Sequence, residues 1–146
     1  TALAVAITER HISRMSARLE SLDDTVQVSE RLLKVAQRLM ESHLDDLRCS
    51  PYIFEMVLMT ADTDFPSGRL YKQLLEEKFE AIIRAGIEAG IYHCPDPART
   101  AKAVSAALAS VLHPVFLVRS RPGELPERCE VVVELINAAL QNPLDK

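Results

Sequence analysis

The segment FEAIIRAGIEAGIY, residues 79–92, carries the clearest structural signal in this sequence. Its apolar residues recur every three or four positions, which places them on one face of an α-helix. The inward residues of this face are Phe79, Ile82, Ile83 and Gly86. Gly90 follows at the position where a glycine ends a helix in the left-handed conformation. The segment therefore predicts the final turns of a long amphipathic helix over residues 69–89.

The same spacing continues in both directions from this segment and predicts an all-α chain. The expected helices span residues 2–22, 26–47, 52–61, 69–89, 98–118 and 127–141, with a frayed tail over residues 142–146. Ser50-Pro51 and Asp96-Pro97 each put a capping side chain directly before a proline, a common helix start. Pro114 lies deep in the fifth helix and predicts a kink there. The expected fold is a six-helix orthogonal or antiparallel bundle.

Composition points to one soluble globular domain over residues 1–146. The chain is 48% hydrophobic and 26% charged, with a formal net charge of −4. An acidic balance argues against a nucleic-acid surface, which needs clustered Lys and Arg. Three scattered cysteines do not make a disulfide framework and favour a reducing, cytoplasmic setting. No apolar run approaches the roughly 18 residues of a membrane span, so no membrane partner is expected.

Motifs for catalysis and metal binding are absent from the sequence. It contains no Glu-x-x-His, His-Glu-x-x-His, Cys-x-x-Cys or Gly-x-Ser-x-Gly pattern. Cys49, His93 and Cys94 could help to ligate zinc, but they lack the dense spacing of a zinc site. We therefore expect no catalytic residue, no metal and no cofactor, and an enzyme is the weaker interpretation.

The last two predicted helices carry more apolar surface than one subunit can bury. The fifth has a second face of small residues beside its core face, and the sixth has apolar residues on more than one stripe. An exposed patch of that size is a liability on a monomer, so we expect a twofold homodimer. The predicted interface residues are Ala103, Ala107, Ser110, Pro114, Val131, Val132, Leu135 and Ala139.

Two histidines have more than one interpretation. His43 falls on the apolar face of the second helix, as either a core histidine with one hydrogen-bond partner or a ligand-binding group. His113 precedes Pro114, and its side chain could bond the carbonyl that the proline leaves unpaired. For both residues the core interpretation is the more common one.

The segment at residues 79–92, followed by Asp96-Pro97-Ala98-Arg99-Thr100-Ala101, resembles the regulatory domain of the TetR family of transcriptional repressors. In that family a long helix ends in a similar glycine-containing pattern, and Asp-Pro opens the first dimerisation helix. The resemblance covers essentially the whole chain in helix order. It implies a homodimer that binds a small effector among its central helices. It further implies a helix-turn-helix module for operator DNA, which the family places before the helix expected at residues 2–22 and which this sequence lacks.

On this resemblance the chain is the effector-binding and dimerisation domain of a ligand-responsive regulator. The effector would be a small apolar or amphipathic molecule that changes the tilt of the first helix and so the spacing of two DNA-reading modules. His43 and Tyr71 would orient it. The hypothetical pocket residues are Met15, Met40, His43, Phe54, Met59, Tyr71, Leu74, Leu108 and Leu112. The alternative is a helical protein–protein interaction adaptor that binds neither DNA nor a small molecule and has no cavity.

Overall fold

The computed structural model describes residues 2–20, 26–59 and 66–142. Within these ranges all regular elements are helices and there is no strand, which confirms the predicted all-α class. The elements are α1 (Ala2–Glu20), α2 (Val28–Cys49), α3 (Pro51–Met59), α4 (Pro66–Glu88), α5 (Pro97–Leu112), α6 (Pro114–Arg119), the 3-10 turn η1 (Pro122–Glu124) and α7 (Leu125–Gln141). The break expected at residues 23–25 and the tail expected after residue 142 lie outside the described residues.

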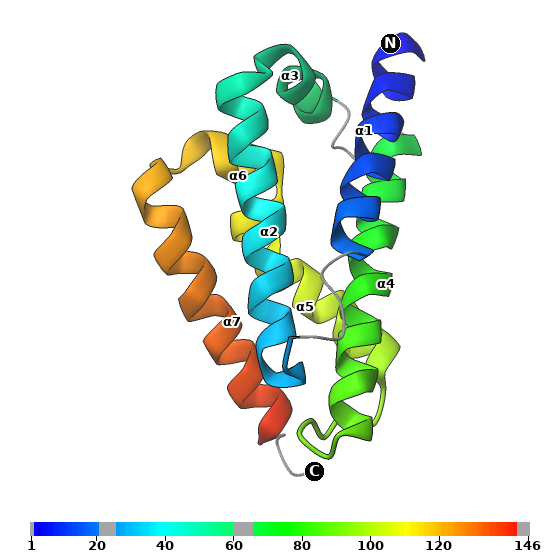
Figure 1. Ribbon diagram of the computed structural model, residues 1–146, viewed down its shortest axis with the longest axis vertical. Coiled ribbons are helices and arrows are strands. Elements are labelled where there is room, and N and C mark those ends of the chain that lie inside the picture. Colours follow the sequence, from blue (N-terminus) through cyan, green and yellow to red (C-terminus); the bar gives the residue numbers. More distant parts are fainter. Residues whose placement is uncertain (1, 21–25, 60–65, 143–146) are drawn as a thin grey trace.

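Helix α2 is the central element of the bundle (Figure 1). It contacts α1 and α4 on one side and α7 on the other, and it also packs against α3 and α5. Helix α4 lies along α5. The core fills the space between these helices, and its fully buried members include Leu32, Ala36, Phe79, Ile83 and Leu108.

Both predicted proline-containing helix starts are confirmed. Helix α3 begins at Pro51, directly after Ser50. At the start of α5 the Asp96 side chain accepts a hydrogen bond from the Arg99 backbone N–H at 3.2 Å. Because this bond satisfies an amide that has no partner inside the helix, it fixes where α5 begins.

A complete interruption replaces the kink expected in the fifth helix. His113 has extended backbone angles (φ −81°, ψ 129°), and its Nδ1 accepts a hydrogen bond from the Val115 N–H at 3.2 Å. The side chain therefore caps α6. Pro114 has no N–H, so the Ser110 carbonyl loses its partner within the helix. Arg128 of α7 donates to that carbonyl at 3.2 Å, in the role that the sequence suggested for His113.

The end of α4 brings a glycine and a tyrosine into close contact. Gly90 has φ +75°, which confirms the left-handed helix end. The chain then turns back so that the Tyr92 ring lies against Gly86, where an added Cβ would be 2.0 Å from Cδ2 of the ring. Tyr92 is 1% exposed, and its hydroxyl donates to Asn137 Oδ1 of α7 at 2.6 Å. Because Gly86 has no side chain, the Tyr92 ring can pack there and connect the turn after α4 to α7 through Asn137.

One described segment, Pro97–Arg119, is long and apolar enough to cross a membrane by length and composition. The core helix of a soluble protein passes the same test. This segment is interrupted at His113, and its α5 part places Ala101, Val104 and Leu108 in the core. Its composition is therefore weak support for a membrane span.

Candidate functional site

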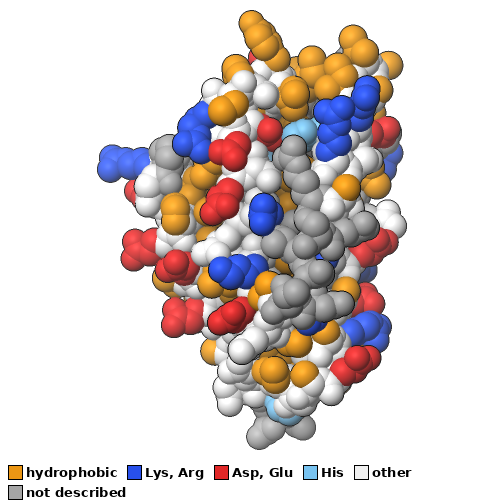
Figure 2. All heavy atoms as spheres, viewed as in Figure 1, with side chains coloured by type: hydrophobic (Ala, Val, Ile, Leu, Met, Phe, Trp, Pro, Cys, Tyr) orange, Lys and Arg blue, Asp and Glu red, His pale blue; other side chains and the backbone are white. Residues whose placement is uncertain are grey.

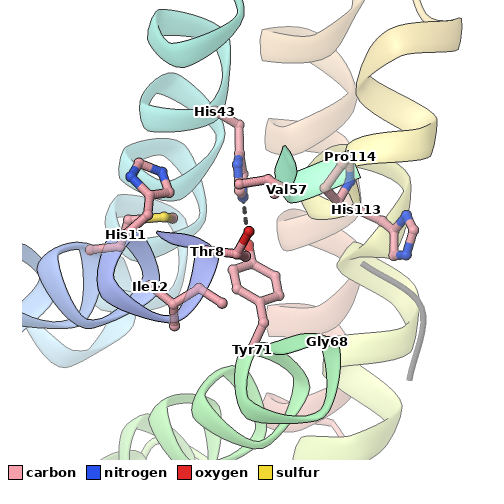
Figure 3. A pocket seen from close by; sticks show the side chains of 10 residues that line it. Thr8, His11, Ile12, His43, Val57, Gly68, Tyr71, His113 and Pro114 are labelled. Carbon is pink, nitrogen blue, oxygen red and sulfur yellow. Dashed lines mark hydrogen bonds between the residues drawn. The ribbon is translucent and has the colours of Figure 1, made fainter. Parts of the chain in front are cut away.

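A small inner cavity lies where α1, α2, α3, α4 and the α5–α6 break meet (Figure 3). Its volume is about 20 Å³, which is room for one water molecule. Four of its wall residues come from α1 alone. The lining residues are Thr8, His11, Ile12, Met15, His43, Val57, Gly68, Tyr71, His113 and Pro114.

A pair formed by a buried histidine and a half-buried tyrosine is the polar centre of this cavity. His43 is 1% exposed, and its Nε2 lies 2.7 Å from the Tyr71 hydroxyl. The dashed line in Figure 3 marks this hydrogen bond. The hydroxyl in turn donates to the Leu112 carbonyl at the end of α5 over 3.5 Å. In this arrangement Nε2–H donates to Tyr71, and Nδ1 keeps its lone pair. Nδ1 is buried and has no hydrogen-bond partner among the described residues.

Burial keeps both members of the pair neutral near pH 7. It lowers the pKa of His43 to about 4, although the nearby Asp46 carboxylate acts in the opposite direction. Burial also raises the pKa of Tyr71. Because an ion transferred here would lose its hydration, the inner cavity suits an uncharged hydrogen-bonding group.

The other two histidines that line the inner cavity make contacts with different partners. His11 of α1 lies with Nε2 2.6 Å from Asp46 Oδ2, so this contact joins α1 to α2 beside the cavity. His113 caps α6 through Val115. In the described part of the chain, no group of three or more His, Cys, Asp or Glu side chains could hold a metal ion.

An outer groove lies between α4 and α5 and has a volume of about 320 Å³. This volume is near the lower end of the range for small-molecule sites, roughly 300–1,000 Å³. Gly68, Tyr71 and His113 line both the groove and the inner cavity, so the two spaces meet at Tyr71. The remaining groove residues are Lys72, Leu75, Glu76, Lys102, Ser105, Ala106, Ala109 and Leu112.

The residues predicted to line an effector pocket fall into two groups. Those that line at least one of the two spaces are Met15, His43, Tyr71 and Leu112. The others line neither space: Met40, Phe54 and Leu108 are buried in the core, Leu74 packs against the core, and Met59 is 57% exposed.

Figure 2 shows hydrophobic side chains gathered at the end of the molecule where α1 begins and α3 lies.

Sequence reasoning missed most of the α1 wall and the polar mouth of the groove. Thr8 and Ile12 are four residues apart and share a helix face with Met15, so helical spacing could have identified them. No sequence signal marks Lys72 or Lys102, because an exposed lysine on a helix is ordinary. Their common position emerges only when α4 packs on α5.

The predicted dimer residues lie mainly on one exposed surface of α5 and α7, two helices that pack together. Arg128 joins them at one end through its bond to the Ser110 carbonyl. Pro114 differs, because it is buried and lines the inner cavity. The exposed members are Ala103, Ala107, Val131, Leu135 and Ala139, while Ser110 and Val132 are half-buried. Leu135 is 68% exposed, so in the single chain this apolar surface is open to water.

Comparison with known proteins identifies a family. Residues 28–133 match the model of a family described as tetracyclin repressor-like, C-terminal domain. No curated protein and no solved structure matches the chain. The matched range begins with α2 and ends within α7, so it includes all of the outer groove and the α2, α3, α4 and α6 residues of the inner cavity.

Proposed function

Because the chain belongs to the family of tetracyclin repressor-like C-terminal domains, we propose that it is the effector-binding and homodimerisation domain of a ligand-responsive transcriptional repressor. The family consists of regulatory domains that typically dimerise and bind effectors and are generally not enzymes. In the proposal a cytoplasmic parent protein binds operator DNA through a helix-turn-helix module that precedes α1.

The observation that carries this proposal is the position of α1 in the wall of the inner cavity. Thr8, His11, Ile12 and Met15 all line it, opposite the His43–Tyr71 pair. A ligand that enters the cavity therefore contacts the helix that, by the family resemblance, leads from the DNA-binding module. This contact gives the effector a direct route to that module.

The small size of the cavity makes movement a requirement for binding. A volume of about 20 Å³ admits one water molecule but no larger effector. The effector must therefore bind a second state, in which α1 or the Tyr71 side chain has moved outward. Such a ligand shifts the population toward that state by its difference in affinity for the two states. The half-site separation of the parent dimer would follow the tilt of α1.

The apolar surface of α5 and α7 supports the dimer part of the proposal. It is contiguous because the two helices pack together, and it centres on residues such as Leu135 and Val131. A twofold axis through this surface would bury it against its own copy. The outer groove, with a volume of about 320 Å³, favours the effector-binding domain over the adaptor alternative, which needs no cavity.

Two measurements on the purified chain test the effector part. A panel of small amphipathic molecules is screened for an increase in melting temperature, and hydrogen exchange of α1 is then compared with and without each hit. We expect a hit to change the exchange of α1, and we expect Ile12→Trp, which fills the cavity, to abolish the temperature shift. Leu3→Trp is the matched control, because Leu3 lies on the same helix but is 71% exposed.

The proposal fails if ligands stabilise the chain without changing α1 exchange and bind the Ile12→Trp variant as well as the native chain. In the parent protein, fluorescence anisotropy with labelled operator DNA should show that the same ligands change DNA affinity. A parent sequence without a helix-turn-helix module before α1 would contradict the regulatory assignment.

A further inference from the structure

We propose that the effector is a small monocarboxylate with an apolar chain, held with its carboxylate between Lys72 and Lys102 and its apolar end against Tyr71. This inference rests on the proposed function and specifies the ligand class of the same site. It treats the outer groove and the inner cavity as two ends of one elongated site.

The outer groove and the inner cavity adjoin each other. Gly68, Tyr71 and His113 line both of them, and Gly68 contributes no side chain that could separate them. Tyr71 stands between the spaces with its hydroxyl turned toward His43 (Figure 3). A ligand lying in the groove therefore reaches the inner cavity by displacing one side chain.

The inner end of this site selects against charge. His43 is buried and neutral near pH 7, and His11 is already in contact with Asp46. A carboxylate placed there would lose its hydration without gaining a cationic partner. The walls contributed by Ile12, Met15 and Val57 accept an apolar chain instead.

The sides of the outer groove carry two cations. Lys72 projects from α4 and Lys102 from α5, on the two sides of the groove, and both are exposed. Neither ammonium group forms a hydrogen bond or ion pair with any described residue. Glu76 also lines the groove and is likewise without an ion pair among the described residues, so the mouth has two cations and one anion. That balance favours a ligand with one negative charge.

The floor between the two ends fits a narrow chain. This part of the groove is apolar, because it is lined by Leu75, Ala106, Ala109 and Leu112. The two alanines leave space that larger side chains would fill. Octanoate, with eight carbons and two oxygens, is therefore a suitable probe.

The test compares three ligands of nearly equal size by isothermal titration of the whole chain at low salt. These are octanoate, the neutral octanamide and the cationic octylamine. We expect octanoate to bind about tenfold more tightly than octanamide, since each of the two exposed ion pairs multiplies the affinity by roughly threefold. Octylamine should bind most weakly, and added salt should reduce the preference for octanoate.

Matched lysine variants locate the charge preference. The double variant Lys72→Gln/Lys102→Gln should bind octanoate and octanamide equally, with octanamide affinity within twofold of the native value. Lys34→Gln/Lys78→Gln removes the same charge from a different surface depression, between α2 and α4, and should keep the preference.

The outcomes separate this inference from the proposed function. Equal affinity for octanoate and octanamide in the native chain, or an unchanged preference in Lys72→Gln/Lys102→Gln, overturns the monocarboxylate. If none of the three ligands binds but other small molecules stabilise the chain and change α1 exchange, the monocarboxylate fails and the regulatory domain stands. If no small molecule does so, both fail.

Discussion

Replacing Gly86 by alanine tests the close contact that ends α4. The new Cβ would lie 2.0 Å from Cδ2 of Tyr92 and 2.6 Å from Cγ and Cε2. Carbon atoms in contact are separated by at least about 3.5 Å, so the ring must move by roughly 1.5 Å. Tyr92 is 1% exposed and bonded to Asn137, so it has little space to move into.

The magnitude follows from three opposing contributions. Forcing an extra methyl group into a packed core costs about 1–3 kcal/mol, and losing the Tyr92–Asn137 hydrogen bond costs about 1 kcal/mol. The gain in helix propensity from glycine to alanine is about 1 kcal/mol. The net effect is a loss of about 1–3 kcal/mol in the free energy of unfolding. For a chain of this length the melting temperature should fall by roughly 3–10 °C.

Circular dichroism at one fixed protein concentration measures this change, because unfolding of a dimer depends on concentration. Gly123→Ala is the control, since a Cβ there meets nothing within 4 Å, and its stability should stay within about 0.5 kcal/mol of the native value. In a Tyr92→Ala background Gly86→Ala should no longer destabilise the chain. The reasoning is refuted if Gly86→Ala leaves native stability unchanged, or if it costs the same with and without the tyrosine ring.

Four further predictions concern other parts of the molecule. Gly90→Ala should cost about 1–2 kcal/mol in urea unfolding, because φ at this position is +75°; an unchanged midpoint would contradict this. Arg128→Met should cost about 1–2 kcal/mol in the same assay, since the Ser110 carbonyl loses its donor; a value near zero would mean that water replaces the arginine. Leu135→Glu should give monomers in sedimentation velocity, whereas Leu3→Glu, at a similarly exposed leucine, should leave the mass of the native dimer; a native chain that is already monomeric would refute the interface. Burial lowers the pKa of His43 to about 4, so below pH 6.5 unfolding takes up a proton, and stability should fall by about 2 kcal/mol between pH 7 and pH 5. His43→Gln should lack that part of the pH dependence.

Helical spacing was sufficient to predict the fold because the apolar residues of each helix repeat regularly. It also identified the ends of elements where one residue decides the conformation, such as Gly90 and the Asp96 cap. It did not predict that the fifth helix ends at residue 112. Pro114 alone removes one hydrogen bond, whereas the break also requires the His113 side chain to take the Val115 amide. Competition between a side chain and the backbone has no periodic signature.

The candidate site was predictable only in part, for a related reason. His43 and Tyr71 were both expected as polar groups that orient an effector, and His43 Nε2 lies 2.7 Å from the Tyr71 hydroxyl. Met40, on the same apolar face of α2 as His43, and Phe54 of α3 were expected in the same pocket but are enclosed in the core. Whether an inward residue borders a cavity or fills the core depends on the shapes of all its neighbours, which spacing along one helix does not contain.

The break between α5 and α6 lies beside two hydrogen bonds to other helices. On its α5 side the Leu112 carbonyl receives the Tyr71 hydroxyl, while two residues earlier the Ser110 carbonyl receives Arg128 of α7. A ligand that displaces Tyr71 thus removes the hydrogen bond to the Leu112 carbonyl. The bond that remains nearby, from Arg128 to Ser110, connects this stretch of backbone to α7, the helix expected to meet the second copy. The strength of subunit pairing would then report whether the ligand is present, even without any DNA.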